Sequence, residues 1–456
     1  MEKKWIEGWM SRHQEKYREI SRKIWEFAEL GMMEYQSAEL LERILEEEGF
    51  AVETNLAGIP TAFCGRYGEG KPVVAILGEF DALEGLSQTA GTVKKEKRQN
   101  GKNGHGCGHN LLGTGSLAAA IALKDYMKEK QMQGTLVYYG CPGEEKGCGK
   151  VHMVQAGCFQ ESDAVLTWHP SDHNGIEGKS SLADLNFLFQ FQGKAAHAAS
   201  SPHLGRNALH AVELLNVGCN FMREHMIPEA RIHYAITDAG GSAPNIVQET
   251  AAVLYEVRAP EMKTAMELRE RICRAAKGAA LMTDTEVQVS WEEGYSEYLP
   301  NDVLNRVGYK NLLCLGGPVF TKEEEKFAEA IRKTYAHEGK ETLRKDIEVY
   351  QGIGGCMPVS TDVGDVSRIA PVMQLYTVCC AQGTPGHSWQ MVSQSGSSIG
   401  KTGMFLAAGV LAMTGADLLE NPELVKEAKE EHSRMTQPYI CPLGENGEKA
   451  GEGRHL

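Results

Sequence analysis

The segment 103–123, NGHGCGHNLLGTGSLAAAIAL, places two histidines and a cysteine among glycines and runs directly into an apolar stretch. The apolar stretch predicts a helix over 116–130, and the run VVAILGEF at 73–80 predicts a buried strand ahead of it. Further strand signals follow at 134–141 (GTLVYYGC) and 164–170 (AVLTWHP). Strands that alternate with helices indicate the α/β class, with a mostly parallel sheet covered by helices on both faces.

The pattern changes in the middle of the chain. Between residues 181 and 293, strand and helix signals follow one another as β-α-β-β-α-β, the order of one compact ferredoxin-like unit. The mixture typical of the first part then resumes, and 456 residues are too many for one ordinary hydrophobic core. We therefore expect a catalytic domain of residues 1–180 and 294–456, into which a smaller domain of residues 181–293 is inserted.

The composition argues against several classes of protein. A net charge of −14, spread along the chain, disfavours nucleic acid or an anionic membrane as the main partner. The first residues are charged and amphipathic, unlike a signal peptide, and we find no continuous apolar run of membrane-spanning length. Twelve cysteines without a signal peptide are expected to be free thiols. These features predict a soluble, cytoplasmic protein.

Four short stretches carry side chains that bind divalent metal ions. Three of the four directly follow an apolar strand signal, and ligands of open parallel sheets bind beyond the carboxyl ends of the strands. Imidazole and thiolate are good zinc ligands, and carboxylate also suits manganese. The stretches are GHGCGHN with His105, Cys107 and His109, GCPGEEKG with Glu144 and Glu145, LTWHP with His169, and GTPGHS with His387.

The spacing of these residues suggests how they would act. Cys107 and His109 stand two apart in what we expect to be a loop, where a tight glycine turn can aim both inward. Of the adjacent Glu144 and Glu145, one can bind metal while the other accepts a proton from an activated water.

Each stretch also has a simpler explanation. The glutamate pair fits a solvated turn, His169 a buried structural histidine, and His387 an ordinary loop residue. The glycines resemble a phosphate-binding loop, but the pattern Gly-x-x-x-x-Gly-Lys-Ser/Thr is missing. A thiol redox protein built on Cys107 would need a resolving cysteine nearby.

The motifs GHGCGHN, GCPGEE, WHP, GKAAHAASSPHLGRNAL, GGSAPNIVQ and GTPGHSW occur in this order around the predicted insert. Together with GEFDAL and STDVGDVS they resemble the M20 family of metallopeptidases and amidohydrolases. The likeness extends from about residue 15 to about residue 430. It implies a zinc-exopeptidase-like catalytic domain with an inserted domain that acts in dimerisation and as a lid.

The resemblance assigns metal-site roles to matching positions. Glu144 corresponds to the general base, and Asp81 in GEFDAL to an acidic residue that orients a ligand from behind the metal centre. Asn110 stands where the amidohydrolase branch usually has aspartate, so any role of that carboxylate is lost here. The implied ligands of two divalent ions per subunit, zinc or manganese, are Cys107, His109, Glu145, His169 and His387.

Three residues of the insert also match family positions. His197 corresponds to a histidine that polarises the scissile carbonyl in the active site of the neighbouring subunit. Asn245 and Arg258 correspond to substrate-binding positions, although Asn245 also fits a turn and Arg258 a structural ion pair. The implied partner is a second copy or a related subunit.

The implied reaction is hydrolysis of the amide bond of an N-acyl amino acid, with p-aminobenzoyl-glutamate as the substrate to which the motifs point most closely. Another acyl group, as in indole-acetyl-aspartate or a general aminoacylase substrate, is an alternative. A second alternative is a largely non-catalytic partner subunit.

Overall fold

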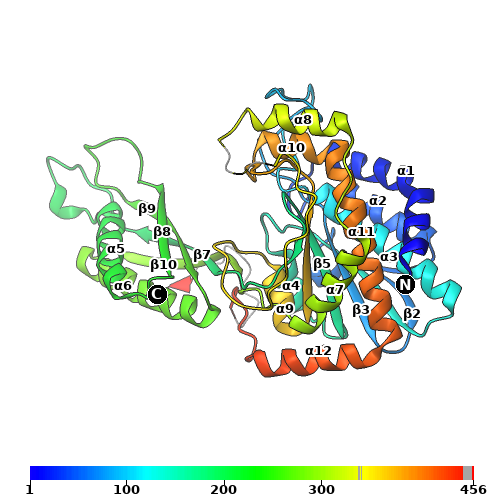
Figure 1. Cartoon of the computed structure of the whole chain (residues 1–456). Coiled ribbons are helices and arrows are strands. Elements are labelled where there is room, and N and C mark those ends of the chain that lie inside the picture. The colour runs from blue at the N-terminus through cyan, green and yellow to red at the C-terminus, as the bar shows by residue number, and fades with distance from the viewer. Residues whose placement is uncertain (337–338, 340, 445–453, 456) are drawn as a thin grey trace. The chain divides into compact units, whose positions relative to one another are not determined.

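The computed structural model describes residues 1–336, 339, 341–444 and 454–455 (Figure 1). The described chain forms two compact units. The first comprises Met1–Lys179, Leu299–Gly355 and Val366–Gln437, and the second comprises Ser180–Tyr298, Cys356–Asp365 and the described residues from Pro438 onward. The second unit thus includes the segment 356–365 and C-terminal residues that the predicted insert of residues 181–293 left out. Neither segment has a periodic apolar pattern from which this could have been predicted.

A seven-stranded mixed sheet forms the centre of the first unit. Its strands are β1 (Ala51–Thr54), β2 (Phe63–Glu69), β3 (Val73–Glu79), β4 (Gly134–Cys141), β5 (Ala164–Ser171), β6 (Gly175–Ile176) and β11 (Val372–Val378). They are ordered β1-β2-β4-β3-β5-β11-β6. The neighbours β4, β3, β5 and β11 run parallel, whereas the outer pairs are antiparallel. The central strands are buried, as the predicted α/β class requires.

Helices pack around this sheet. They are α1 (Lys3–Phe27), α2 (Tyr35–Glu47), α3 (His109–Lys130), α4 (Gly149–Gln155), α7 (Asp302–Leu315), α8 (Lys322–Arg332), α10 (Trp389–Ser395), α11 (Ser398–Glu420) and α12 (Pro422–Met435). The short helix α9 (Val363–Ile369) begins in a segment of the second unit and ends in the first. Among the described residues, α11 alone is long and apolar enough to cross a membrane by length and composition, but 78% of its apolar window is buried. It packs against α3, α7 and β11, so it is a core helix of this unit.

The helix predicted over 116–130 begins earlier, at His109, so the expectation that His109 lies in a loop was wrong. The preceding Gly108 has a φ of 84°, a conformation that favours glycine, and it turns the chain into the helix. A side chain at Gly108 would also press on Pro170, and one at Gly106 would clash with Leu86. Backbone conformation and close packing therefore both favour glycine at Gly108, and His109 lies in the first turn of a regular helix.

The second unit is a five-stranded antiparallel sheet with two helices packed on it. Its elements are β7 (Ala183–Gln192), α5 (Ala208–Met222), β8 (Arg231–Asp238), β9 (Thr250–Ala259), α6 (Met262–Thr283), β10 (Glu286–Tyr295) and β12 (Arg454–His455). The strand order is β12-β10-β7-β9-β8, with β8 at one edge. Alternate residues of β7, namely Phe187, Phe189 and Phe191, are buried in the core between sheet and helices.

Candidate active site

The candidate metal ligands of the first unit come together beyond the carboxyl ends of its parallel strands. His169 lies near the end of β5, the glutamate pair follows β4, His387 follows β11, and the cysteine precedes α3. Their donor atoms form compact groups, within each of which all atoms lie within 4.8 Å of one another. The groups are Cys107 with His109 and His169, Cys107 with Glu145 and His387, and Glu79 with His109 and Glu144.

Cys107 belongs to two of these groups. Its Sγ lies 3.3 Å from His169 Nε2, and on the other side His387 Nε2 lies 3.3 Å from Glu145 Oε2. The two groups that contain Cys107 therefore lie next to each other and share one donor atom.

Two buried atoms of these groups are without a hydrogen-bond partner among the described residues, namely His109 Nε2 and Glu145 Oε1. Buried polar atoms in native proteins are nearly always paired, because an unpaired one costs free energy. Both atoms are good donors to a divalent cation. The residues present therefore fit the metal centre that the motifs imply.

Asp81, directly after β3, holds two members of the site. Its Oδ1 accepts a hydrogen bond from His109 Nδ1 at 2.7 Å, and its Oδ2 accepts one from the backbone N–H of Glu145 at 2.8 Å. Because the Nδ1 proton of His109 is engaged, Nε2 is the atom left to bind metal. His169 has the same arrangement, since its Nδ1 lies 2.8 Å from the carbonyl oxygen of Pro170.

The charges of the cluster shift the pKa values of its members. Burial alone would lower the pKa of His109, but the charge and hydrogen bond of Asp81 together with the neighbouring Cys107 outweigh it and raise that pKa well above its usual value. Burial lowers the pKa of His169. Burial would raise the pKa of Glu145, but the hydrogen bond to His387 contributes to a net lowering. The same hydrogen bond raises the pKa of the half-exposed His387.

Burial raises the pKa of the Cys107 thiol, and the charge of Glu145 adds to the shift. Without a cation this residue therefore stays a thiol. A divalent cation deprotonates a thiol that coordinates it, so metal binding at Cys107 would release a proton.

A buried ion pair that was not predicted from the sequence lies beside the site. Lys150 Nζ lies 2.7 Å from Glu79 Oε1, both side chains are almost completely buried, and Glu79 Oε2 lies 3.4 Å from His109 Nε2. Burial would raise the pKa of Glu79, but the charges of Lys150 and His109 lower it. The one available signal was a glutamate inside the apolar run VVAILGEF. Nothing in the sequence joins it to a lysine 71 positions later.

Lys150→Met is expected to lower the free energy of unfolding of the first unit by about 3–5 kcal/mol, because it removes the nearest cation from the buried Glu79 carboxylate and leaves only the more distant His109 beside it. Urea denaturation followed by circular dichroism measures the change. The double variant Glu79→Gln with Lys150→Met removes both charges and should recover most of the loss. A single variant as stable as the unmodified protein would contradict the pairing.

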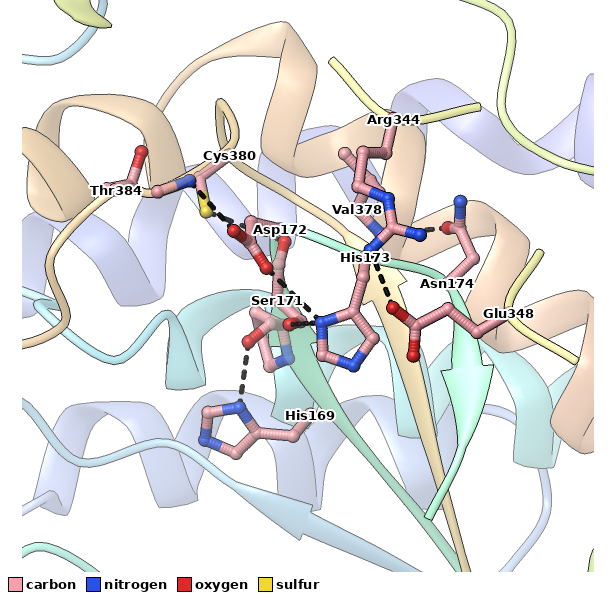
Figure 2. Close-up of polar contacts among 12 residues, drawn as sticks. His169, Ser171, Asp172, His173, Asn174, Arg344, Glu348, Val378, Cys380 and Thr384 are labelled. Carbon is pink, nitrogen blue, oxygen red and sulfur yellow. Dashed lines mark hydrogen bonds and ion pairs between the residues drawn. The ribbon is translucent and has the colours of Figure 1, made fainter. Parts of the chain in front are cut away.

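Figure 2 shows the residues that follow His169 at the end of β5. Ser171 Oγ lies 2.8 Å and Asp172 Oδ1 lies 3.2 Å from the same atom, His173 Nδ1. In a serine nucleophile relay the histidine contacts serine and acid through its two different ring nitrogens. This trio therefore does not form such a relay. Asp172 instead accepts a hydrogen bond from Gly383 N at 2.8 Å, which ties the strand end to the loop leading to His387.

The remaining predicted residues lie in the second unit. His197 is exposed, and its Nδ1 accepts hydrogen bonds from the backbone N–H groups of Ala199 and Ser200, both at 3.2 Å. The ring proton therefore sits on Nε2, which can donate. Asn245 lies close to His197 in the structure, since the backbone carbonyl oxygen of Asn245 accepts a hydrogen bond from Ala198 N at 3.0 Å.

Arg258 makes ion pairs within the second unit. Its Nη2 lies 3.2 Å from Asp184 Oδ2 and 2.9 Å from Glu256 Oε1. Burial raises the pKa of Asp184 to about 7 although the charge of Arg258 opposes the shift. These contacts are those of the structural ion pair that the sequence left as an alternative to substrate binding.

Known proteins resemble this chain in sequence and in fold. The chain is 44% identical to one of the subunits of p-aminobenzoyl-glutamate hydrolase from Escherichia coli (strain K12), over 97% of this chain and 98% of that protein. An aminobenzoyl-glutamate utilization protein from Klebsiella pneumoniae superposes with a TM-score of 0.63 at 17% identity, over 91% of this chain and 98% of that one.

A dinuclear metal binding peptidase of the M20 family from Bacillus subtilis superposes with a TM-score of 0.57 at 16% identity, over 88% of this chain and 99% of that one. At such identities the two structural likenesses concern the fold. Residues 75–388, which include every candidate metal ligand, match the family described as Peptidase family M20/M25/M40. Through this match and the full-length relative, the chain belongs to the M20/M25/M40 peptidase family of metal-dependent hydrolases.

Proposed function

We propose that this protein hydrolyses the amide bond of N-acyl amino acids, that it uses two divalent ions, zinc or manganese, per subunit, and that p-aminobenzoyl-glutamate is its substrate. The observation that carries the proposal is the sharing of Cys107 between two donor groups, which suits a pair of adjacent ions. The substrate rests on the 44% identity, along nearly the whole chain, to a relative named for that hydrolysis.

When bound, the two ions lower the pKa of a water molecule and polarise the amide carbonyl. Glu144 follows β4 next to Glu145, and its carboxylate lies within 4.8 Å of donor atoms of His109 and Glu79. This position suits a base that accepts a proton from the attacking water and returns it to the leaving amine. The products are a carboxylic acid and a free amino acid. A complete donor set with a base beside it argues against a non-catalytic scaffold.

The second unit supplies the partner interface in this proposal. Its edge strand β8 is largely exposed and includes the exposed side chains of Tyr234 and Ile236. On α5, Leu214, Val217 and Phe221 are spaced along one face and exposed, Phe221 by 74%. An open strand edge and an exposed apolar helix face within one unit favour pairing with a second copy or a related subunit. The Escherichia coli relative is named as one subunit of a hydrolase, which agrees with this.

In such a dimer, His197 would complete the site of the neighbouring subunit by donating from Nε2 to the oxygen that becomes negative during attack. Mixing inactive His197→Ala subunits with inactive Glu144→Gln subunits is therefore expected to restore activity, because some mixed dimers hold one site with both residues intact. Hydrolysis after subunit exchange measures the recovery. No recovery despite proven exchange would mean that His197 acts within its own chain or has no catalytic role.

The substrate is tested by reconstituting the purified chain with zinc or manganese and assaying a panel of acyl-glutamates and acyl-aspartates. Release of p-aminobenzoate should have the highest kcat/KM. Faster hydrolysis of indole-acetyl-aspartate would favour the alternative acyl group, and hydrolysis only after addition of a related chain would indicate a heterodimer. Lack of hydrolysis under both conditions would overturn the proposed activity. The proposed location is the cytoplasm, in keeping with twelve free cysteines.

A further inference from the structure

The loop between β4 and α4, which carries Glu144 and Glu145, is fixed at two backbone positions by buried carboxylates. Gly143 N donates a hydrogen bond to Glu34 Oε1 at 2.8 Å, and Glu145 N donates one to Asp81 Oδ2 at 2.8 Å. Glu144 lies between these two anchors. Its Cα position is therefore set from both sides.

Glu34 is itself held firmly. Its side chain is fully buried, and its second oxygen, Oε2, accepts a hydrogen bond from Thr61 Oγ1 at 3.0 Å. It stands immediately before α2, so its backbone is continuous with a regular helix. Burial, helped by the charge of Asp81, raises the pKa of Glu34 to about 7. A carboxyl group that is buried in this way needs partners, and the loop supplies one of them.

The residues just before Glu34 are shaped to the same loop. A Cβ atom at Gly31 would lie 2.4 Å from the carbonyl oxygen of Lys146 and 3.0 Å from Gly143 Cα. Met32 packs so closely that a Cβ atom at Gly147 would lie 2.6 Å from Met32 Cγ. The segment 31–34 thus packs tightly against the loop, and Glu34 makes the hydrogen bond between them, to Gly143 N.

We propose that Glu34 is a positioning residue for hydrolysis, acting through the Gly143 backbone to hold Glu144 where it can accept the proton of the attacking water. The inference rests on the proposed function, in which Glu144 is the base. A general base must lie within hydrogen-bond reach of the proton it removes, and a displacement of about 1 Å can cost about 10²-fold in rate. Glu34 does not need to touch the substrate or the ions to have this effect.

Glu34→Ala removes the acceptor of the Gly143 amide. It is expected to lower kcat by about 10- to 100-fold with KM and metal content nearly unchanged, and to speed hydrogen exchange of the Gly143 amide. Glu34→Gln keeps an acceptor oxygen of the same length and should recover most of the kcat and the protection from exchange. If Glu34 had only a structural role, kcat would instead fall equally in both variants, in proportion to their loss of stability.

Glu29→Ala is the matched control. Glu29 is five positions earlier and accepts hydrogen bonds from the N–H groups of Gln36 and Ser37, so its loss weakens the start of α2. It should lower Tm without changing kcat. An equal fall of kcat in Glu29→Ala, or unchanged kcat and unchanged exchange in Glu34→Ala, would overturn the inference.

Exchange of the Gly143 amide needs no substrate, so it separates the two proposals. If the unmodified protein hydrolyses no acyl amino acid, the proposed function fails on that result alone. Faster exchange in Glu34→Ala would then still establish that Glu34 holds the loop, whereas unchanged exchange would overturn the positioning inference whatever the activity.

Discussion

Replacing Glu144 by glutamine is expected to lower kcat for amide hydrolysis by about 10²–10⁴-fold, the range typical of a lost general base, while leaving the metal content nearly intact. The amide is of similar size but cannot accept the proton at neutral pH. Its neighbour Glu145 has a buried oxygen that is without a hydrogen-bond partner in the described part of the chain, and it belongs to a donor group with Cys107 and His387. Glu145→Gln is therefore expected to lower metal occupancy itself.

Steady-state kinetics and elemental analysis of the two variants, reconstituted in parallel, separate these roles. The variants form a matched pair, since they carry the same chemical change at adjacent positions. Equal metal loss and equal residual rates would mean that base and ligand have been assigned to the wrong members of the pair.

Cys107→Ala is expected to reduce the metal content from the proposed two ions per subunit to one or fewer, because this single Sγ belongs to two of the three donor groups, the two that are proposed to hold the ions. Loss of any other ligand would leave one of these two groups complete. Elemental analysis after reconstitution with zinc or manganese gives the stoichiometry. Cys314→Ala, which removes an exposed thiol from α7, is the control and should keep both ions. A content of one ion or less in the unmodified protein, insensitive to Cys107→Ala, would contradict the two-ion site.

The sequence alone predicted those site residues that are of a metal-binding type and directly follow a strand signal. His169 and the glutamate pair follow apolar runs, and the carboxyl ends of parallel strands meet at one edge of a sheet. The same reasoning put His109 in a loop, because glycines hide a helix start. The left-handed conformation of Gly108 that begins α3 becomes visible only in the structure.

The supporting residues could not be predicted in this way. Glu34 acts on Gly143 from a position 109 residues earlier, and Glu79 at the end of β3 pairs with Lys150 on α4. Neither contact leaves a periodic or motif signal, because each depends on how distant elements pack. The segment 356–365 joins the second unit for the same reason, since its place depends on tertiary contacts and not on a local pattern.

The crowding around Gly106 and Gly108 bears on how the motif is read in other proteins. A Cβ atom at Gly106 would lie 2.6 Å from the Leu86 side chain, and one at Gly108 would lie 3.1 Å from Pro170, where the φ of 84° also favours glycine. A saturation library across this stretch is therefore expected to score both glycines as sensitive to substitution, although neither is a metal ligand. Conservation of these glycines therefore reflects packing and backbone conformation as well as chemistry. A preserved GHGCGH pattern in a distant homologue would show that this local structure has been kept. The ligands contributed by Glu145, His169 and His387 must then be checked separately before activity is inferred.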